Sequence, residues 1–536
     1  MPHERDAGRR HRRIDVVEHD AVLAVCVPHS VEAWKTLPVR VPPANRANPT
    51  SESERRMMGT DPGALPSPES IENLNSPVVI VGQILSVLVP LIIWFAPLSL
   101  DELNTQHCVA IVGFMVVAWI TRAMEYALTG LIGCFLFWAL GVVRFPVAFS
   151  GFANETAWFV FGALLLGMVV TRSAIARRIA YFVMLRVGVT YPRILLGLIT
   201  TDFLLTFLVP AGAARVVIMA SIAIGLAEAF NAAPGSNVTR GMFLVLTYTA
   251  NIFDKMIIAG AASITARGLI EKVGGVEVRW SYWFIAFLPS SIITVLAAWW
   301  LTLKLYPPEN VALAGGRDFL RAELRKLGAL SPMERRAAVL MAAAILLWLT
   351  DFLHHISPAV IAMGAGLFAL LPRVGVLETE DLRRLDYLPV FFVAAAVSMG
   401  VVLEETNGLH VLTGAVFAFT QPLMTNTVTT TIVMYWTAVV SHFFLASEIS
   451  MLGTSMPLVM EFAKSHGLNP LLLGMIWTFA AGGKLFVYQS GVLIIGYSYG
   501  YFAARDLLRM GALLTLIEFI VLLLLVAFYW PLIGLH

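Results

Sequence analysis

The length of the apolar segments is the feature that most constrains how this chain folds. Two of them begin at Pro77 (PVVIVGQILSVLVPLIIWFAPLSL) and at Gly511 (GALLTLIEFIVLLLLVAFYWPLIGL). Each is longer than the roughly 20 apolar residues that a helix needs to cross a bilayer. Hydrophobic residues make up 58% of the 536 residues and charged residues only 13%, which excludes an ordinary soluble protein. The sequence therefore predicts an all-α polytopic membrane protein.

The chain divides into four parts by composition. They are a polar tail (1–76), a first transmembrane repeat with a leading helix (77–305), a polar linker (306–335) and a second transmembrane repeat (336–536). The tail lacks apolar periodicity, which predicts a disordered cytoplasmic segment. Met57 and Met58 near its end leave open whether the preceding residues are translated. The linker, predicted to be cytoplasmic, ends in Ser331-Pro332-Met333-Glu334, a capping box that predicts the start of a helix.

About eleven apolar segments are predicted to be transmembrane helices. They lie near 77–99, 107–121, 126–145, 156–174, 240–263, 281–305, 336–353, 357–372, 389–405, 470–500 and 510–533. Two further segments, 194–230 and 428–463, carry small or polar residues at their centres and are predicted to be re-entrant hairpins. Their tips are Ala211-Gly212-Ala213 and Ser447-Glu448-Ile449. Because irregular backbone at membrane depth is tolerated beside a cavity, both tips are expected to face one, where helix N-termini can hold an anion.

The two halves of the membrane region resemble each other. FFVAAAVSMGVVLE, from Phe391, can be laid on VFGALLLGMVVT, from Val160, and both are centred on a Met-Gly pair. Two copies of one unit is the simplest interpretation, although chance similarity between apolar helices is the alternative. Arginine and lysine cluster at 172–193, in the linker, at 373–384 and at 505–509, which predicts that these segments are cytoplasmic. The hairpins must then enter from opposite sides, which predicts inverted repeats, an architecture of many secondary transporters.

Two lysines lie inside apolar segments at matching places in the two halves. The first segment, TANIFDK, ends at Lys255, and the second, TFAAGGK, ends at Lys484. A charge inside hydrocarbon is expensive, so a duplicated pair indicates a site between two repeats, and its positive sign indicates an anionic cargo. Asp254 is the candidate partner of Lys255, and Glu448 that of Lys484. A purely structural role, as ion pairs with snorkelling ends, stays open.

Five segments carry a resemblance to a known family. They are FVFGALLLGMVVTRSAIARRIA, VPAGAARVVIM, ASITARGLI, HFFLASEISMLGTSMP and YQSGVLIIGYSYGYFAARDLLRMGALLTLI. Through them the chain, over roughly 77–536, resembles the divalent anion:sodium symporter family, solute carrier family 13 in animals, within the ion transporter superfamily. The resemblance implies a scaffold domain, a transport domain, eleven spans, two hairpins and a homodimer in the cell (inner) membrane. It also implies transport of di- or tricarboxylates or sulfate, often with sodium.

The hairpin tips depart from the family's pattern. Members carry Ser-Asn-Thr at each tip, whereas this chain has Ala211-Gly212-Ala213 and Ser447-Glu448-Ile449. Backbone amides for a carboxylate remain, but most side-chain oxygens for sodium do not, so sodium coupling is doubtful. Proton coupling is open, because a buried lysine titrates readily. The predicted substrate-binding residues are Ala211, Gly212, Ala213, Arg215, Lys255, Ser263, Thr265, Ser447, Glu448, Ser450, Lys484, Gln489 and Ser490.

Other functions are weighed against this one. The main alternative keeps the superfamily and changes the cargo, as a cation/proton antiporter or a metalloid-anion carrier. A cation carrier would show more intramembrane carboxylates than cations, whereas Arg215, Lys255 and Lys484 are cations. A membrane-embedded lipid-modifying enzyme would need a nucleophile or an acid–base pair at a membrane face, and no such group is visible. The expected partners are a small anion, the bilayer and a second subunit. No cofactor, resident metal, catalytic residue or nucleic-acid partner is expected.

Overall fold

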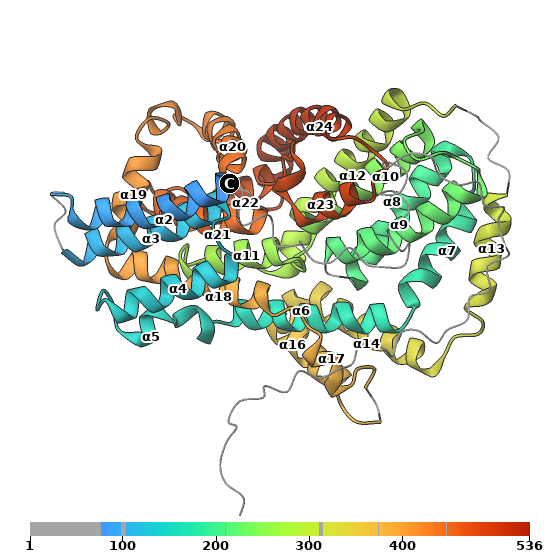
Figure 1. Ribbon diagram of the computed structural model, residues 1–536, viewed down its shortest axis with the longest axis horizontal. Coiled ribbons are helices and arrows are strands. Elements are labelled where there is room, and N and C mark those ends of the chain that lie inside the picture. The colour runs from blue at the N-terminus through green and yellow to red at the C-terminus, as the bar shows by residue number, and fades with distance from the viewer. Residues whose placement is uncertain (1–76, 98–102, 210, 310–314, 374, 446) are drawn as a thin grey trace, which may run out of the picture. The chain divides into compact units, whose positions relative to one another are not determined.

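The computed structural model describes residues 77–97, 103–209, 211–309, 315–373, 375–445 and 447–536 (Figure 1). Within these ranges the regular structure is helical and contains no strand. The predicted all-α class is confirmed. The tail over 1–76 lies outside the described residues, so its disorder and its translation stay predictions.

Helices of the first half follow the predicted spans closely. In chain order they are α2 (Pro77–Phe95), α3 (Leu103–Thr121), α4 (Tyr126–Ala139), α5 (Phe145–Ala148), α6 (Glu155–Arg172), α7 (Ile175–Val187), α8 (Tyr191–Leu208), α9 (Gly212–Ala229), α10 (Asn237–Met256), α11 (Ala261–Lys272) and α12 (Trp280–Leu305). The pair α8 and α9 is the first predicted hairpin, and its break lies at the predicted tip. The span predicted as continuous near 240–263 is instead two helices, α10 and α11, separated at 257–260.

The helices of the second half also include a hairpin and a broken helix. After α13 (Gly316–Lys326) they are α14 (Pro332–Leu349), α15 (Asp351–His354), α16 (Pro358–Ala369), α17 (Thr379–Arg383), α18 (Leu388–Glu405), α19 (Gly408–Phe417), α20 (Thr427–Phe444), α21 (Glu448–Ser465), α22 (Pro470–Ala480), α23 (Gly491–Ser498), α24 (Ala504–Leu524) and α25 (Trp530–Leu532). The second hairpin is α20 with α21, and the second broken helix is α22 with α23. The inverted relation of the halves and their membrane sides stay predictions.

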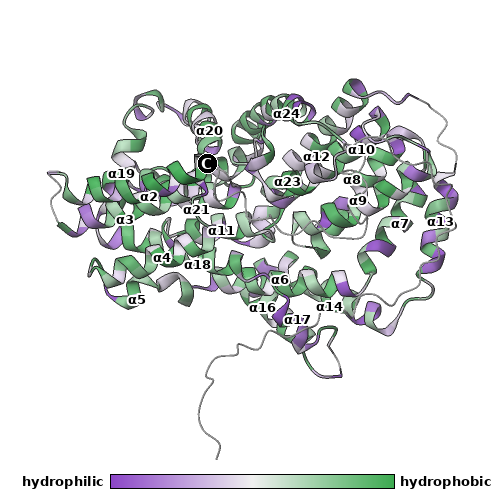
Figure 2. Ribbon diagram, in the orientation of Figure 1, coloured by the Kyte–Doolittle hydropathy of each residue, from purple (hydrophilic) through white to green (hydrophobic). Residues whose placement is uncertain are grey.

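The outer surfaces fit a bilayer. Among the described helices, eight are long and apolar enough to cross a membrane. Large apolar side chains remain exposed on them and on their neighbours, as in Val339 (70%), Phe528 (67%) and Leu532 (82%). Figure 2 shows hydrophobic residues along most helices and hydrophilic residues gathered on α13 and near α17. Such faces are stable only against lipid or another subunit.

Several helices lie between the predicted spans, and α7 and α13 are two of them. The predicted polar linker contains α13, whose charged residues face outward, and it ends at the predicted capping box. There Glu334 N–H donates to the Ser331 hydroxyl, and the Ser331 N–H donates to the Glu334 carboxylate at 2.7 Å. The Arg-rich segment after α6 forms α7, which packs against α8 and α13. Both are short or strongly charged, so an apolar-run criterion overlooks them.

The two halves contact each other through α6 with α16 and α4 with α18, and also through the hairpins and the broken helices. Helix α11 of the first half packs against α21 of the second half, and α23 packs against α9 and α10. The tip of the first hairpin lies close to α10. A Cβ added at Gly212 would overlap the carboxylate of Asp254. A side chain at this position would require the Asp254 carboxylate to move. These contacts bring both hairpin tips and both helix breaks to one place.

Candidate functional site: a cavity between helix N-termini

One cavity, of about 490 Å³, is lined by residues from both hairpin tips and both helix breaks. The lining includes Ala211–Ala214 at the start of α9, Gly260–Ser263 at the start of α11, Ser447–Ile449 at the start of α21, and Ser490–Val492 at the start of α23. Most of the rest of the lining comes from α6 and from residues 384–389, which lead into α18. Four helices therefore begin at this cavity.

Helix N-termini favour an anion for two reasons. The first N–H groups of a helix have no partner within the helix, and the helix dipole places partial positive charge there. Helices α21 and α23 satisfy part of this need with Ser447 and Ser490, whose hydroxyls accept from Ser450 N–H (3.2 Å) and Val492 N–H (3.3 Å). Helices α9 and α11 begin after Ala211 and Gly260, which offer no side-chain cap. The arrangement is suited to binding carboxylate or sulfate oxygens.

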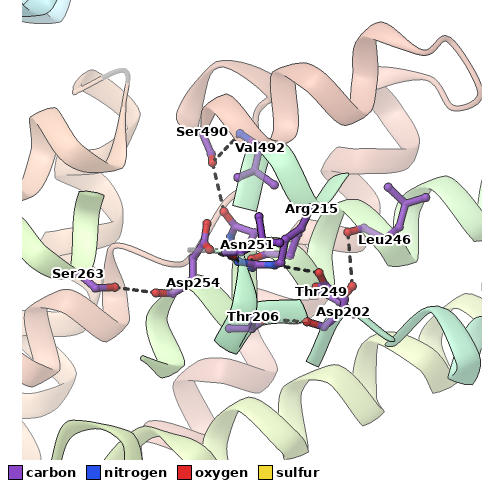
Figure 3. A network of polar contacts seen from close by, with 12 residues as sticks. Asp202, Thr206, Arg215, Leu246, Thr249, Asn251, Asp254, Ser263, Ser490 and Val492 are labelled. Carbon is purple, nitrogen blue, oxygen red and sulfur yellow. Dashed lines mark hydrogen bonds and ion pairs between the residues drawn. The ribbon is translucent and has the colours of Figure 1, made fainter. Parts of the chain in front are cut away.

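A buried arginine stands behind the first hairpin tip. Arg215, on α9, is fully buried and forms ion pairs with Asp202 on α8 and Asp254 on α10, each at 2.9 Å. Its remaining N–H groups donate to the carbonyls of Val209 (3.0 Å) and Ala250 (2.7 Å). Figure 3 shows this guanidinium between the two aspartates. The arginine thereby fixes the tip to α10 and compensates the charge of Asp254, which lines the cavity.

A buried lysine plays the corresponding part at the second tip. Lys484 lies in the break between α22 and α23, and its Nζ donates to the Glu448 carboxylate at 2.5 Å, as the sequence predicted. The same Nζ donates to the amide oxygen of Asn251 on α10, which also accepts from the Ser490 hydroxyl at 3.2 Å. This network ties the two halves together (Figure 3 shows its Asn251–Ser490 part). Glu448 itself lines the cavity.

Lys255 does not belong to this network. Its Nζ lies 3.1 Å from the Glu518 carboxylate on α24 and 5.0 Å from the centre of the Phe479 ring. The predicted Lys255–Asp254 pair is therefore wrong, since Asp254 binds Arg215. Adjacent residues on a helix point in different directions and do not face each other. Neither Lys255 nor Lys484 lines the cavity, although Lys484 contacts Glu448, which does.

The thirteen predicted site residues fall into two groups. Those that line the cavity are Ala211, Gly212, Ala213, Ser263, Ser447, Glu448 and Ser490; those that do not are Arg215, Lys255, Thr265, Ser450, Lys484 and Gln489. Within the second group, Thr265 donates back to Ala261 O on its own helix (2.7 Å). Gln489 accepts the N–H groups of Leu485 (2.7 Å) and Phe486 (2.8 Å), so it holds the α22–α23 break in shape. Contact with a substrate stays a prediction for all thirteen.

Sequence reasoning missed the structural roles of four polar side chains. Asp202 and Asn251 are fully or almost fully buried partners of Arg215 and Lys484, and Glu518 is the partner of Lys255. Asp254, named only as a lysine partner, lines the cavity. Each is a polar side chain inside an apolar segment, and that signal could have identified it. Within the described ranges, no group of three or more His, Cys, Asp or Glu side chains is arranged to hold a metal ion.

Comparison with known proteins bears on this geometry. Residues 78–536 match the family model described as "Sodium:sulfate symporter transmembrane region". A "Membrane protein" of Cupriavidus necator is 24% identical over 457 residues, which cover 80% of this chain and 88% of that protein. A "Citrate/succinate antiporter" of Escherichia coli K12 is 25% identical over 72% of this chain and 80% of its own length. An "L-tartrate/succinate antiporter" of Shigella flexneri is 25% identical, with the same two shares.

Proposed function

The chain belongs to the sodium:sulfate symporter transmembrane family, and from this premise we propose that it exchanges small dicarboxylates across the inner membrane. It is a multi-pass membrane protein and a transporter of small anions, as the family and the antiporter relatives indicate. The finer proposal is that the cargo is a C4 to C6 di- or tricarboxylate. Relatives named for citrate, succinate and tartrate support it.

The convergence of four helix N-termini on one cavity is the observation that carries this proposal. The first residues of these helices, at 211–214, 260–263, 447–449 and 490–492, border a space of about 490 Å³. Donors on several sides suit an elongated anion with a charged group at each end. We infer from these donors on several sides, and not from the cavity volume, that the site fits a dicarboxylate better than it fits sulfate.

We also propose that transport does not depend on sodium. At each tip a fixed cation, Arg215 or Lys484, already binds the nearby carboxylate, Asp254 or Glu448. These buried cations give the carboxylates of the cavity wall a counter-charge that a bound sodium ion could otherwise provide. Because they belong to the chain, the carboxylates keep this counter-charge when no ion is bound from solution. A carrier of this kind is suited to exchange of one anion for another.

Proteoliposomes test both parts of the proposal. Purified protein is reconstituted with or without internal succinate, and uptake of labelled succinate is measured in sodium, potassium and choline buffers. We expect uptake into succinate-loaded vesicles that is equal in the three buffers, and little uptake into empty vesicles. Strict dependence on sodium would contradict the coupling proposal. Equal uptake into loaded and empty vesicles would contradict exchange.

A cation or proton carrier of the same superfamily is the second candidate. The observation that favours it is the presence of two carboxylates, Asp254 and Glu448, in the cavity wall. Against it, both carboxylates are bound by cations that would have to be displaced. The same vesicles decide between the two, because a cation carrier would move labelled sodium or protons without succinate. As the family resemblance implies, we further propose that the transporter is a homodimer, which cross-linking in membranes tests.

A further inference from the structure

Four ionisable side chains line the cavity, and only one of them is a cation. They are Asp254, Glu448, Arg384 and Asp386. The first two are compensated from behind by Arg215 and Lys484. Arg384 is exposed, and within the described residues it forms no ion pair and no side-chain hydrogen bond. It is therefore the uncompensated positive charge of the cavity wall.

The backbone that carries Arg384 is firmly placed. It follows α17, whose N-terminal Asp381 is buried and binds Arg172 at the end of α6 at 3.1 Å. Asp381 also accepts the N–H of Glu378 at 2.8 Å, and its carbonyl accepts the N–H of Arg384 at 3.1 Å. An ion pair and a closed helical turn thus fix the position from which the guanidinium extends.

The residues after Arg384 add to this placement. The Tyr387 hydroxyl donates to Leu382 O at 2.7 Å, and its ring stacks on Phe161 of α6 at 6.1 Å between centroids. One carboxylate oxygen of Asp386 accepts the N–H of Leu388 at 3.0 Å and so caps α18. Asp386 therefore binds the backbone at the start of α18 and forms no ion pair with Arg384. The backbone of Arg384 is thus fixed at the cavity wall that also contains the helix N-termini, and among the described residues the guanidinium donors are unused.

We propose that Arg384 binds the second carboxylate of the transported anion, while the helix N-termini bind the first. This inference rests on the proposed function and names the residue that selects dianions over monoanions. A guanidinium matches a carboxylate through two parallel N–H···O bonds, which a lysine ammonium cannot reproduce. An anion with a single carboxylate would reach the N-termini but leave Arg384 without a partner.

Kinetics of succinate exchange in proteoliposomes test this role. Arg384→Gln is compared with Arg384→Lys and with Arg383→Gln, in which the neighbouring arginine, bound to Glu380 at 3.0 Å and outside the cavity lining, is replaced. We expect Arg384→Gln to raise the KM for succinate about tenfold, the value of one lost charge-assisted bond pair, with Vmax changed less than about twofold. The KM of Arg384→Lys should lie between those of Arg384→Gln and the unmodified protein. The KM of Arg383→Gln should equal that of the unmodified protein.

Two further measurements separate substrate contact from a structural effect. Inhibition by monomethyl succinate, which has one carboxylate, should be the same with and without Arg384. Asp386→Asn keeps the oxygen that caps α18 but removes a negative charge, so it should lower the KM for succinate. An unchanged KM in Arg384→Gln, or an equal rise in Arg383→Gln, overturns the inference while leaving the proposed function intact. Absence of succinate exchange by the unmodified protein overturns the proposed function and this inference with it.

Discussion

Each hairpin tip has a buried cation paired with a carboxylate of the cavity wall, but the two tips place these charges on different elements. At the first tip the cation, Arg215, lies on the hairpin helix α9, and its carboxylate partner, Asp254, lies on the broken helix. At the second tip the carboxylate, Glu448, lies on the hairpin helix α21, and the cation, Lys484, lies in the helix break. In both cases the carboxylate lines the cavity and the cation is fully buried behind it.

This exchange shows which residues correspond in function. Position along the chain pairs Lys255 with Lys484, but the geometry pairs Arg215 with Lys484. A buried charge is tolerable only with a partner, and both cations have one. The two cations differ in the number of groups that they bind. Arg215 binds two carboxylates and two carbonyls, whereas Lys484 binds one carboxylate and one amide. The first tip should therefore be fixed to its half more firmly than the second.

The largest effect is expected at the first tip. Arg215→Met leaves Asp202 and Asp254 without a counter-charge and four hydrogen bonds unmade, which should lower the free energy of unfolding by about 3–5 kcal/mol. The measurement is the thermal unfolding midpoint of the protein in detergent. The control is Arg186→Met, since Arg186 is exposed on α7 and contacts only the Phe182 ring among the interactions described for it. If Arg215→Met unfolded at the same temperature as Arg186→Met, the first tip would not be the more firmly fixed of the two.

At the second tip, replacement of Lys484 is expected to lower both the stability of the protein and its affinity for succinate. Lys484→Met leaves the Glu448 carboxylate uncompensated in the cavity wall, where it repels an anion by about 2–3 kcal/mol, or a roughly 100-fold higher KM for succinate. The double variant Lys484→Met with Glu448→Gln removes that repulsion. It should recover most of the affinity. A KM that stays high in the double variant would show that Lys484 itself contacts the anion.

Lys255 should behave differently from Lys484, in spite of its matching place in the sequence. Lys255→Met leaves the buried Glu518 carboxylate without a counter-charge and should lower the free energy of unfolding by about 3 kcal/mol. Because the pair lies outside the cavity lining, the KM for succinate should change less than about twofold. Adding Glu518→Gln should restore most of the stability. A large rise in KM with normal stability would reinstate Lys255 as a substrate contact.

The sequence predicted features that depend on local pattern and missed those that depend on tertiary partners. The two hairpin breaks follow from the small and polar residues at 211–213 and 447–449, and the structure confirms them, whereas the spans predicted as continuous near 240–263 and 470–500 are each two helices. The pairing of Lys255 with Glu518 could not be predicted in this way, because the two residues lie 263 positions apart in the chain. Arg384 lies in a polar segment that resembles any cytoplasmic loop. Its place in the cavity wall depends on how α17 docks on α6.

The smallest expected effect concerns the caps of the two tips. Ser447 caps α21, whereas the equivalent position before α9 is Ala211, which has no side-chain acceptor. A serine cap is worth about 1 kcal/mol, so Ala211→Ser should raise the unfolding free energy and Ser447→Ala should lower it by similar amounts. Thermal midpoints of the two variants measure this directly. Shifts of the same sign would mean that N–H groups at the first tip already have other partners. Opposite shifts would show that the first tip keeps more N–H groups free for an anion than the second.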